Sequence, residues 1–570
     1  MNRGQLTATH WGNYWIATDG NTVTVTPSEH DPYPSPIGAS LAATHDKECR
    51  VTRPSIRLGY LRDRSDSDTT RRGKEPFVEV EWDEALDIVA EALRETKSTR
   101  GNDAIYGGSY GWSSAGRFHH AQSQIHRFLR GFGGYTDSVG SYSFAAGQAI
   151  FPHIMGYDAF AGILQTPSNR DITENCGLLV YFGGAPFRNS QVNPGGVGQH
   201  NVRDQIEAIR TSGLKTVNVS PIRDDVDAAL GAEWWPCRPN SDTAIMLALA
   251  HTLFVEDLHD RSYLDRYTVG FDNFVRYILG ESDGQAKDAD WASALSELPA
   301  DDIRALARRM AKTPTLLSVS LSIQRAEHGE QPYWAVITLA AMLGTIGKRG
   351  LGFIMSSGVG KMASLQRRIL PFDIAALPQG DNPIRDFIPV SRITEMLEEP
   401  GRRFNYNGHS HTYPDIRLIY WAGGNPFHHH QDLNRMRQAW AHPRTIITHE
   451  INWTTTARYA DIVLPCTSPL EREDFAGSRS DNSLMPMPPV LPPFGEARDD
   501  YTIFSDLASR LGFQQVFTEG LTANQWVERL YERTRENAEK GWYCAAEVCS
   551  VSAGTASLSG RSHSRRVVHQ

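Results

Sequence analysis

Residues 104–150, with the sequence AIYGGSYGWSSAGRFHHAQSQIHRFLRGFGGYTDSVGSYSFAAGQAI, contain two polar loops that each precede a helical pattern. The first loop occupies 109–114, and the apolar spacing over 118–129 then predicts a helix. The second loop reads GSYS and leads into another helical run. Main-chain N–H groups at a helix start lack partners within the helix, so they bind anions or are capped by a serine hydroxyl. Spacing alone favours Ser113 and Ser143 as such N-caps.

The composition indicates a large protein with several domains. A chain of 570 residues exceeds the usual size of one domain, and 40% hydrophobic and 10% aromatic residues are enough for extensive cores. The net charge of −9 is spread along the chain, and no basic face carries interleaved aromatic residues. Nucleic-acid binding therefore has little support.

The cysteines are few and scattered. None of the six forms a CxxC pair, so the sequence predicts neither a structural zinc site nor a cysteine-bound iron–sulfur cluster. A disulfide framework is also disfavoured, which suits a reducing compartment.

The amino terminus shows neither an apolar signal sequence nor a twin-arginine leader, and no apolar run has the length of a membrane-spanning helix. We expect a cytoplasmic protein that does not bind a membrane.

Two parts of the chain alternate apolar runs with helical patterns. The runs end at glycine-rich or polar turns, as the buried strands of a parallel sheet do. Gly183 follows the first run, and such a turn either lets a phosphate approach the main chain or only accommodates packing. We therefore expect an α/β fold with two doubly wound domains. The apolar runs are 176–182 and 216–219 in the first part, and 418–422, 445–448 and 460–465 in the second.

Three segments lack this alternation. Residues 1–55 show short strands and proline-rich turns, which predict a small β-rich region. Residues 53–75 are polar and rich in arginine, which predicts a solvated surface segment. Residues 354–415 contain many prolines without a clear period, so we expect an irregular connection between layers.

Three consecutive histidines, at 428–430, precede a predicted helix. Adjacent helical residues point about 100° apart, so the three side chains cannot all face one ion. We expect a polar contact from histidine to a nucleotide here, rather than a metal held by the protein.

Taken together and in order, the motifs of the chain resemble the dimethyl sulfoxide reductase family of molybdenum enzymes. Within that family the chain is most similar to the biotin sulfoxide, dimethyl sulfoxide and trimethylamine N-oxide reductases. The resemblance extends from Thr9 to Asn537. The matching motifs are Ser109-Tyr110-Gly111-Trp112, Gly140-Ser141-Tyr142-Ser143, Ser322-Ile323-Gln324-Arg325 with Gly329-Glu330-Gln331, Trp421-Ala422-Gly423-Gly424-Asn425-Pro426 with His429-His430-Gln431-Asp432, and Ala460-Asp461-Ile462-Val463-Leu464-Pro465 with Glu471-Arg472.

The resemblance implies a cofactor of molybdenum held by two molybdopterin guanine dinucleotides, without an iron–sulfur cluster. Four sulfurs then come from the cofactor, so the protein supplies one metal ligand, which by motif match is the Oγ of Ser143. A hard oxygen suits a high-valent ion, and the soft sulfur ligands require no cysteine. Trp112 and Tyr110 match the positions that donate hydrogen bonds to the transferred oxygen. Ser143 is then a metal ligand, whereas Ser113 keeps its role as a cap.

Further cofactor contacts follow from the same resemblance. Those expected at one nucleotide tail are Ser220, Arg238, Ser241 and Asp242. Those expected at the other are Gly424, Asn425, His429, Gln431, His449 and Asp461. Contacts to the cofactor are also expected from Gly111, Trp112, Gly183, Gln324 and Arg325. One departure from the family is Ser141, which replaces a common aspartate beside the metal ligand.

The implied reaction removes oxygen from an S-oxide or an N-oxide and releases a sulfide or an amine. The substrate class includes biotin sulfoxide, methionine sulfoxide, dimethyl sulfoxide and trimethylamine N-oxide. Two electrons and two protons complete the reaction, and water leaves. Because the sequence has no iron–sulfur motif, the electrons must come from an external donor. We expect a monomer whose partners are this donor and a small-molecule oxide.

The family also implies a division into domains. Members continue into a further domain that closes over the pterins, whereas residues 549–570 are rich in serine, arginine and histidine. Two functions therefore stand: an active oxygen-transfer enzyme, or a truncated remnant that binds cofactor poorly. A nicotinamide-dependent dehydrogenase is disfavoured, because no GxGxxG pattern with a downstream acid follows the early strands. The expected parts are a β-rich region at 1–55 joined by part of 354–410, an α/β cofactor-binding domain at 56–165 with 411–540, a Rossmann-like α/β domain at 166–353, and a disordered or aberrant tail at 541–570.

Overall fold

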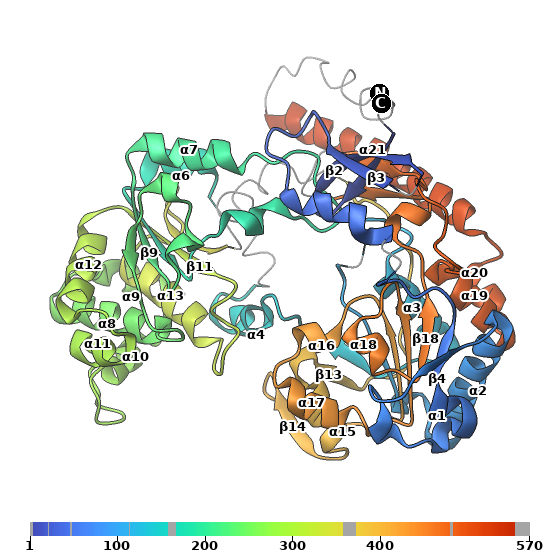
Figure 1. Ribbon diagram of the computed structural model, residues 1–570. Coiled ribbons are helices and arrows are strands. Elements are labelled where there is room, and N and C mark those ends of the chain that lie inside the picture. The colour runs from blue at the N-terminus through green and yellow to red at the C-terminus, as the bar shows by residue number, and fades with distance from the viewer. Residues whose placement is uncertain are drawn as a thin grey trace. The chain divides into compact units, whose positions relative to one another are not determined.

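Contacts between residues divide the chain into two compact units, each made of discontinuous segments (Figure 1). The first unit comprises Met1–Gly140, Asn193–Gln199 and Leu370–Gln570, and the second comprises Ser141–Val192 and His200–Ile369. The division into three domains and a tail expected from the sequence stays a prediction. The computed structural model describes residues 4–20, 22–45, 48–112, 114–157, 167–356, 372–478 and 483–552.

A small antiparallel sheet begins the first unit. Its strands are β1 (Gln5–Thr9), β2 (Gly12–Asp19) and β3 (Thr22–Pro27), paired in that order and followed by the 3-10 helix η1 (Pro36–His45). Tyr14 and Ile16 alternate into the interior of this sheet and pack with Leu470, which comes from far along the chain. The small β-rich region predicted at the amino terminus is confirmed.

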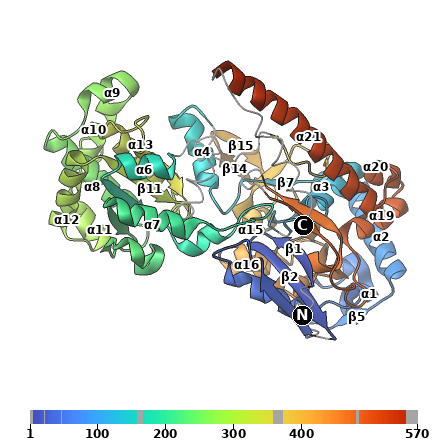
Figure 2. The ribbon, with the colours of Figure 1, turned by 90° about the horizontal axis from the view of Figure 1, so that it is seen from above.

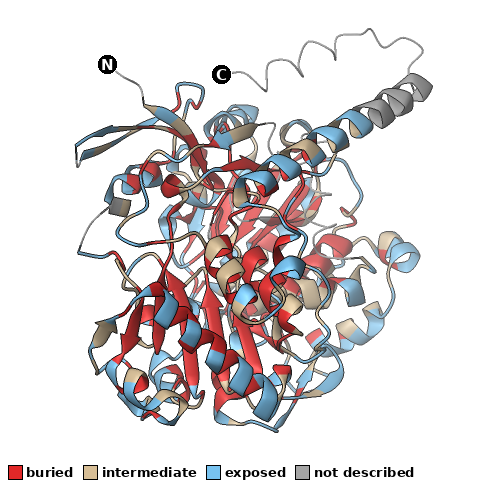
Figure 3. Ribbon diagram, turned by 90° about the vertical axis from the view of Figure 1, so that its right-hand side faces the viewer, coloured by how far each residue is buried: buried red, intermediate tan, exposed pale blue. Residues whose placement is uncertain are grey.

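A six-stranded sheet forms the centre of the first unit. Its strands are β4 (Ser55–Arg57), β5 (Phe77–Glu79), β6 (Ile105–Gly108), β16 (Leu418–Ala422), β17 (Thr445–Glu450) and β18 (Ile462–Pro465). The order is β5-β4-β18-β17-β16-β6, and the last four strands are parallel. Figure 3 shows the strands buried between layers of helices. The helices are α2 (Trp82–Arg100), α3 (Ala121–Phe132) and α19 (Asp500–Arg510) on one face, and α15 (Ile393–Glu398) and α17 (Leu433–Ala439) on the other.

A five-stranded parallel sheet forms the centre of the second unit. Its strands are β8 (Leu178–Phe182), β9 (Lys215–Val219), β10 (Glu233–Trp235), β11 (Thr315–Ser320) and β12 (Gly352–Ser356), in the order β10-β9-β8-β11-β12. One face packs on α8 (Asp242–Val255), α12 (Ala300–Lys312) and α13 (Gln331–Met342), and the other packs on α6 (Asn169–Asn175) and α7 (Val202–Ser212). Figures 1 and 2 both show α8 and α12 beside α11 (Ala289–Ser296). Helices on both faces of each sheet confirm the predicted α/β class.

The prediction of an irregular connection at 354–415 is wrong for much of its described part. Strands β14 (Arg403–Tyr406) and β15 (His409–Thr412) form an antiparallel hairpin there. The φ angles of Asn407 and Gly408 are +48° and +80°, as a two-residue hairpin turn requires. The Asn-Gly pair is typical of a hairpin turn and could have indicated it. The strands on either side are polar, so they do not show the apolar alternation by which strands are recognised.

The carboxyl-terminal part of the described chain is helical. After α20 (Gln514–Thr518), helix α21 (Ala523–Ser552) buries Trp526 and Leu530 in the core of the first unit. It continues into the tail expected from residue 541, while 553–570 lie outside the described residues.

In the part of the chain that the structure describes, no helix is long and apolar enough to cross a membrane. The remaining elements are α1 (Leu58–Asp63), β7 (Asp137–Val139), α4 (Ala145–Ile154), α9 (Arg261–Tyr267), α10 (Phe271–Ile278), β13 (Phe387–Pro389), α16 (Pro426–His429), α18 (Thr455–Arg458), β19 (Asp474–Gly477) and β20 (Leu484–Met487), with short 3-10 turns between elements.

Candidate cofactor site

Ser143 lies in the second unit, immediately before helix α4. Phe144 occupies the N-cap position of α4, and its side chain makes no capping hydrogen bond. Instead, the N–H of Ala146 donates to Gln324 Oε1 at 2.8 Å. The Ser143 N–H donates to Ser141 Oγ at 3.2 Å, while Ser143 Oγ makes no hydrogen bond to another described residue. The interpretation of Ser143 as a helix cap is therefore wrong, and the same interpretation of Ser113 lies outside the described residues.

The loop after β6 in the first unit packs against the loop after its neighbour β16. The N–H of Tyr110 donates to the carbonyl of Gly423 at 3.0 Å. Gly424 lies beneath the phenol ring at a φ of +85°, and a Cβ there would come within 2.7 Å of the Tyr110 ring. The ring of His429 lies 4.8 Å from that of Tyr110. Parallel strands end at one edge of their sheet, which is why residues from two distant motifs meet here.

Trp112 follows in the same loop and is 51% exposed. Its ring centroid lies 5.1 Å from that of His10. Burial lowers the pKa of His10 to about 4, so this imidazole is neutral at physiological pH. Between Tyr110 and Trp112, the carbonyl of Gly111 contacts Nε2 of His120 at 2.6 Å. Trp112 is thus about half-exposed, whereas the carbonyl of Gly111 beside it is held by His120.

A cavity of about 360 Å³ with both polar and apolar lining residues lies beside this loop, within the first unit. Its lining includes Arg117, whose guanidinium donates to the carbonyls of Ala375 and Ile374. Among the described residues Arg117 forms no ion pair. The carboxylate of Asp474 accepts main-chain N–H groups from Arg117, Phe118 and His119, and its charge also acts on the Arg117 guanidinium. The cavity can therefore hold anionic oxygens.

Asp242 is the first residue of helix α8 in the second unit, seven residues after the end of β10. It is 8% exposed, and its Oδ1 has no hydrogen-bond partner. Burial raises its pKa to about 6. Beside it, Ser241 Oγ donates to the carbonyl of Arg238 at 2.6 Å, and the exposed Arg238 forms no ion pair with another described residue. A buried carboxylate oxygen without a hydrogen-bond partner suits a ligand that carries N–H donors.

Four other predicted positions in the second unit contact the protein itself. A Cβ on Gly183 would lie 2.4 Å from Cγ2 of Ile323, so glycine here accommodates packing. Ser220 is fully buried, and its hydroxyl donates to Asp225 at 2.8 Å. Gln324 and Arg325 contact the main chain on either side of Ser143. These contacts are all within the protein, and the cofactor contacts expected at the four positions stay predictions.

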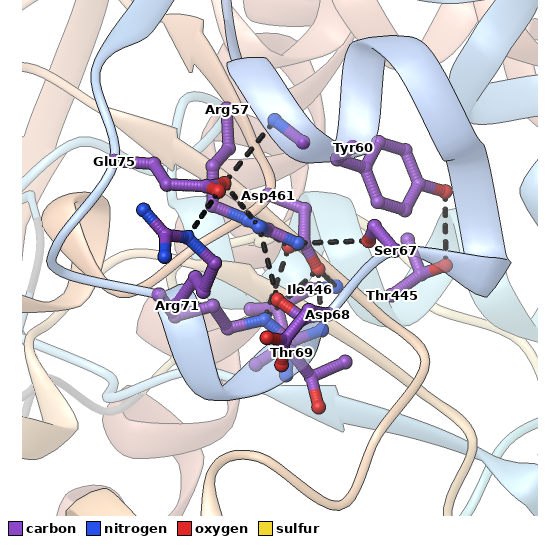
Figure 4. A network of polar contacts seen from close by, with 12 residues as sticks. Arg57, Tyr60, Ser67, Asp68, Thr69, Arg71, Glu75, Thr445, Ile446 and Asp461 are labelled. Atoms are coloured by element: carbon purple, nitrogen blue, oxygen red, sulfur yellow. Dashed lines mark hydrogen bonds and ion pairs between the residues drawn. The ribbon is translucent and has the colours of Figure 1, made fainter.

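Asp461 is fully buried at the start of β18 in the first unit, where the chain itself surrounds its carboxylate (Figure 4). Oδ1 accepts from Arg57 Nε at 2.9 Å and from Arg72 Nε at 3.0 Å. Oδ2 accepts from Arg72 at 2.5 Å and from the N–H of Ile446 at 2.8 Å. The structure does not support its assignment to the nucleotide. The prediction of a solvated segment at 53–75 is wrong at both arginines, since this carboxylate draws them into the interior.

His449 is a buried residue of β17 and takes part in a chain of hydrogen bonds. Its Nδ1 contacts Asp500 at 2.9 Å, and its Nε2 contacts the hydroxyl of Tyr420 at 2.8 Å. Both ring nitrogens are therefore used inside the first unit, so the structure does not support a nucleotide contact. The amide of Gln431 similarly donates to the carbonyl of Ser391 at 3.0 Å. No sequence pattern pointed to Asp500, which lies 51 residues beyond His449.

The three consecutive histidines have different surroundings. His428 is exposed, whereas His429 packs on Tyr110. His430 is buried with Nε2 2.8 Å from Thr394, and burial lowers its pKa to about 4. Nearby, Asn425 accepts a hydrogen bond from the hydroxyl of Thr456. Within the described ranges, no group of three or more histidine, cysteine or acidic side chains could hold a metal ion.

Comparison with protein families and known proteins gives consistent results. Residues 50–510 match the model of the molybdopterin oxidoreductase family, and residues 7–44 match the model of the molybdopterin oxidoreductase N-terminal domain. The biotin sulfoxide reductase of Cereibacter sphaeroides is 44% identical over 519 residues, which cover 90% of this chain and 69% of that protein. The dimethyl sulfoxide/trimethylamine N-oxide reductase of Rhodobacter capsulatus is 37% identical over 547 residues, which cover 94% and 66%.

Two further comparisons agree. The trimethylamine-N-oxide reductase of Haemophilus influenzae is 38% identical over 92% of this chain and 65% of its own length. The acetylene hydratase of Pelobacter acetylenicus has a similar fold, with a TM-score of 0.57 at 16% identity over 90% of this chain and 70% of that one. The chain spans about two thirds of the length of the curated relatives that it matches. By sequence, this chain belongs to the molybdopterin oxidoreductase family.

Proposed function

We propose that this protein is a molybdenum-dependent reductase that removes oxygen from S-oxides or N-oxides. The observation that carries the proposal is Ser143 Oγ, which makes no hydrogen bond among the described residues although the main chain around it is held. The substrate class follows from the names of the relatives, which are reductases of biotin sulfoxide, dimethyl sulfoxide and trimethylamine N-oxide. These matches cover 90–94% of the chain and do not favour a non-catalytic remnant.

The proposed cofactor is molybdenum with two molybdopterin guanine dinucleotides, and residues of this chain fit it. Ser143 offers a hard oxygen ligand. The unpartnered carboxylate oxygen of Asp242 suits guanine, whose ring N–H and amino group are adjacent donors. The cavity at Arg117 suits the anionic oxygens of the cofactor or of a substrate. When bound, the cofactor supplies the two-electron chemistry of oxygen transfer.

Trp112 and Tyr110 are proposed to orient the substrate. An indole N–H can only donate a hydrogen bond, and a phenol donates one readily, so both suit the oxygen of an S-oxide or N-oxide. Packing of Tyr110 on Gly424 and His429 fixes the direction of its ring. The overall reaction consumes one oxide, two electrons and two protons, and it yields a sulfide or an amine and water. The external electron donor, the monomeric state and the cytoplasmic location remain predictions.

The proposal is tested on the purified full chain. Molybdenum and guanine nucleotide are measured per chain, and reduction of the three oxides is assayed with a reduced viologen dye as electron donor. We expect one molybdenum and two guanine nucleotides, and an activity that falls by about 100-fold in Ser143→Ala. Ser212→Ala, which alters a hydroxyl at the end of α7, serves as the matched control and should remain active. A chain without molybdenum, or a fully active Ser143→Ala variant, would overturn the proposal.

A further inference from the structure

Gln324 and Arg325 lie in the loop between β11 and α13, and both reach the segment that carries Ser143. Gln324 is 6% exposed. Its Oε1 accepts from the N–H of Ala146 at 2.8 Å, and its amide nitrogen donates to the carbonyl of Ser143. Arg325 Nε donates to the carbonyl of Tyr142 at 2.8 Å. Two side chains of one loop thus make three hydrogen bonds to another segment of the same unit.

All three contacts are to main-chain atoms on both sides of the Ser143 Cα. The N–H of Ala146 is one of the donors that a helix start leaves without a partner in the helix. A nearby serine usually fills this role, but here the acceptor comes from a residue 178 positions away in the sequence. As a result, the local hydroxyl of Ser143 is not used as a cap. The arrangement holds the main chain and leaves the side chain for another purpose.

We propose that Gln324 and Arg325 are positioning residues that hold Ser143 as the metal ligand, and that they do not themselves contact the cofactor. The inference rests on the proposed function, since it assigns a purpose to the hydroxyl that these contacts leave unused. It changes the role that family resemblance gave to both residues. An amide side chain is suited to this position because it accepts from Ala146 and donates to Ser143 at once.

The first test uses the protein without cofactor. Hydrogen exchange at the Ala146 amide is compared among the native protein, Gln324→Leu and a control, Gln285→Leu. The control removes a glutamine whose amide donates to its neighbour Ala286 in an exposed turn. We expect exchange to be at least tenfold faster in Gln324→Leu and unchanged in the control. Unchanged exchange in a folded Gln324→Leu would overturn the proposal.

The second test uses protein loaded with molybdenum and reads the electron paramagnetic resonance spectrum of the Mo(V) state. We expect Gln324→Leu to keep the metal but to shift the spectrum toward that of Ser143→Ala. Arg325→Ala should shift it less, and Arg325→Lys, which keeps a donor for the Tyr142 carbonyl, should restore it. Because Arg325 is exposed, its substitution should not prevent folding, so the comparison of Arg325→Ala with Arg325→Lys still tests the proposal if Gln324→Leu does not fold.

The results separate this inference from the proposed function. Lost molybdenum with unchanged exchange at Ala146 would show a direct cofactor contact and overturn the positioning role. A native spectrum in both Gln324→Leu and Arg325→Ala would also overturn it. A native chain that binds no molybdenum would instead overturn the proposed function, while the exchange experiment would still test whether Gln324 holds the segment.

Discussion

Two buried aspartates, one in each unit, differ in what their carboxylates contact. Asp461 accepts hydrogen bonds from two arginines and from the N–H of Ile446. Asp242 is buried to a similar degree, yet its Oδ1 has no partner. Moving a carboxylate from water into the protein interior costs several kcal/mol of free energy unless the protein replaces its hydrogen bonds to water. A buried carboxylate whose oxygen lacks a hydrogen-bond partner is therefore a better candidate for ligand binding than one that the protein fully hydrogen-bonds. Neither burial nor the presence of a family motif makes this distinction.

The largest effect is expected from Asp461→Asn. The substitution keeps the shape of the side chain but leaves Arg57 and Arg72 buried without this negative charge. Of these two arginines, only Arg57 keeps a second carboxylate partner, Glu75. We expect the free energy of unfolding in urea at pH 7 to fall by about 3–5 kcal/mol. A loss below about 1 kcal/mol would show that Asp461 is not the structural centre of this network.

Asp242→Asn should act in the opposite direction. The pKa of Asp242 is about 6 in the folded protein against an ordinary 3.8, so the folded state holds the proton more tightly. This contribution to stability is complete below pH 3.8 and is lost as the pH rises through about 6. The free energy of unfolding of the cofactor-free protein should therefore fall by about 3 kcal/mol between pH 3.5 and pH 7 through this group.

In Asp242→Asn that component of the pH dependence should disappear, and the variant should be at least as stable as the native protein at pH 7. The measurement is the difference between the two unfolding curves over this pH range. Glu450, whose pKa burial raises to about 8, contributes to both proteins and cancels in the difference. Identical pH dependence in the two proteins would show that Asp242 is compensated by a partner.

A smaller effect is expected from Arg72→Lys. Arg72 contacts both oxygens of Asp461 and the carbonyls of Trp440 and Pro443, which requires the planar fork of a guanidinium. Lysine keeps the charge but cannot make all these bonds, so we expect a loss of about 2 kcal/mol in urea unfolding. Arg71→Lys, at an exposed neighbour, is the matched control. Equal losses in both variants would argue against a role for the fork.

The smallest effect is expected from Asp63→Asn. Asp63 pairs with Arg62 at the surface, where water and salt screen the charges. We expect no measurable change in the urea midpoint of unfolding. A shift as large as that of Asp461→Asn would mean that the loss of any carboxylate destabilises the protein, and the contrast between buried and exposed pairs would then fail.

Local patterns allowed much of the fold to be predicted. The apolar run at 418–422 has the same bounds as β16, and the run at 176–182 contains β8. A strand buried on both faces must be apolar throughout, and its end must turn, so the signal lies within a few residues. The approach of Tyr110 to Gly424 was not predicted, although both residues follow strands whose ends lie at one edge of the sheet.

The polar contacts could not be predicted in the same way. Arg57 and Asp461 are separated by 404 residues, and nothing in the segment at 53–75 distinguishes an arginine that faces water from one that faces a distant carboxylate. The contact of Gln324 with Ala146 is of the same kind. Motif resemblance identified several of these residues as important, but it gave ligand contacts to side chains that the structure uses to hold other parts of the protein.

The contacts of Gln324 and Arg325 have a thermodynamic consequence for cofactor insertion. Restricting the main chain of one flexible residue costs about 1–2 kcal/mol of conformational entropy. Because the fold already restricts the segment from Tyr142 to Ala146, this loss occurs during folding and is absent from the binding step. On the proposal that Ser143 binds the metal, affinity for the cofactor would be higher than a disordered ligand loop would allow, since fewer degrees of freedom would be lost on binding.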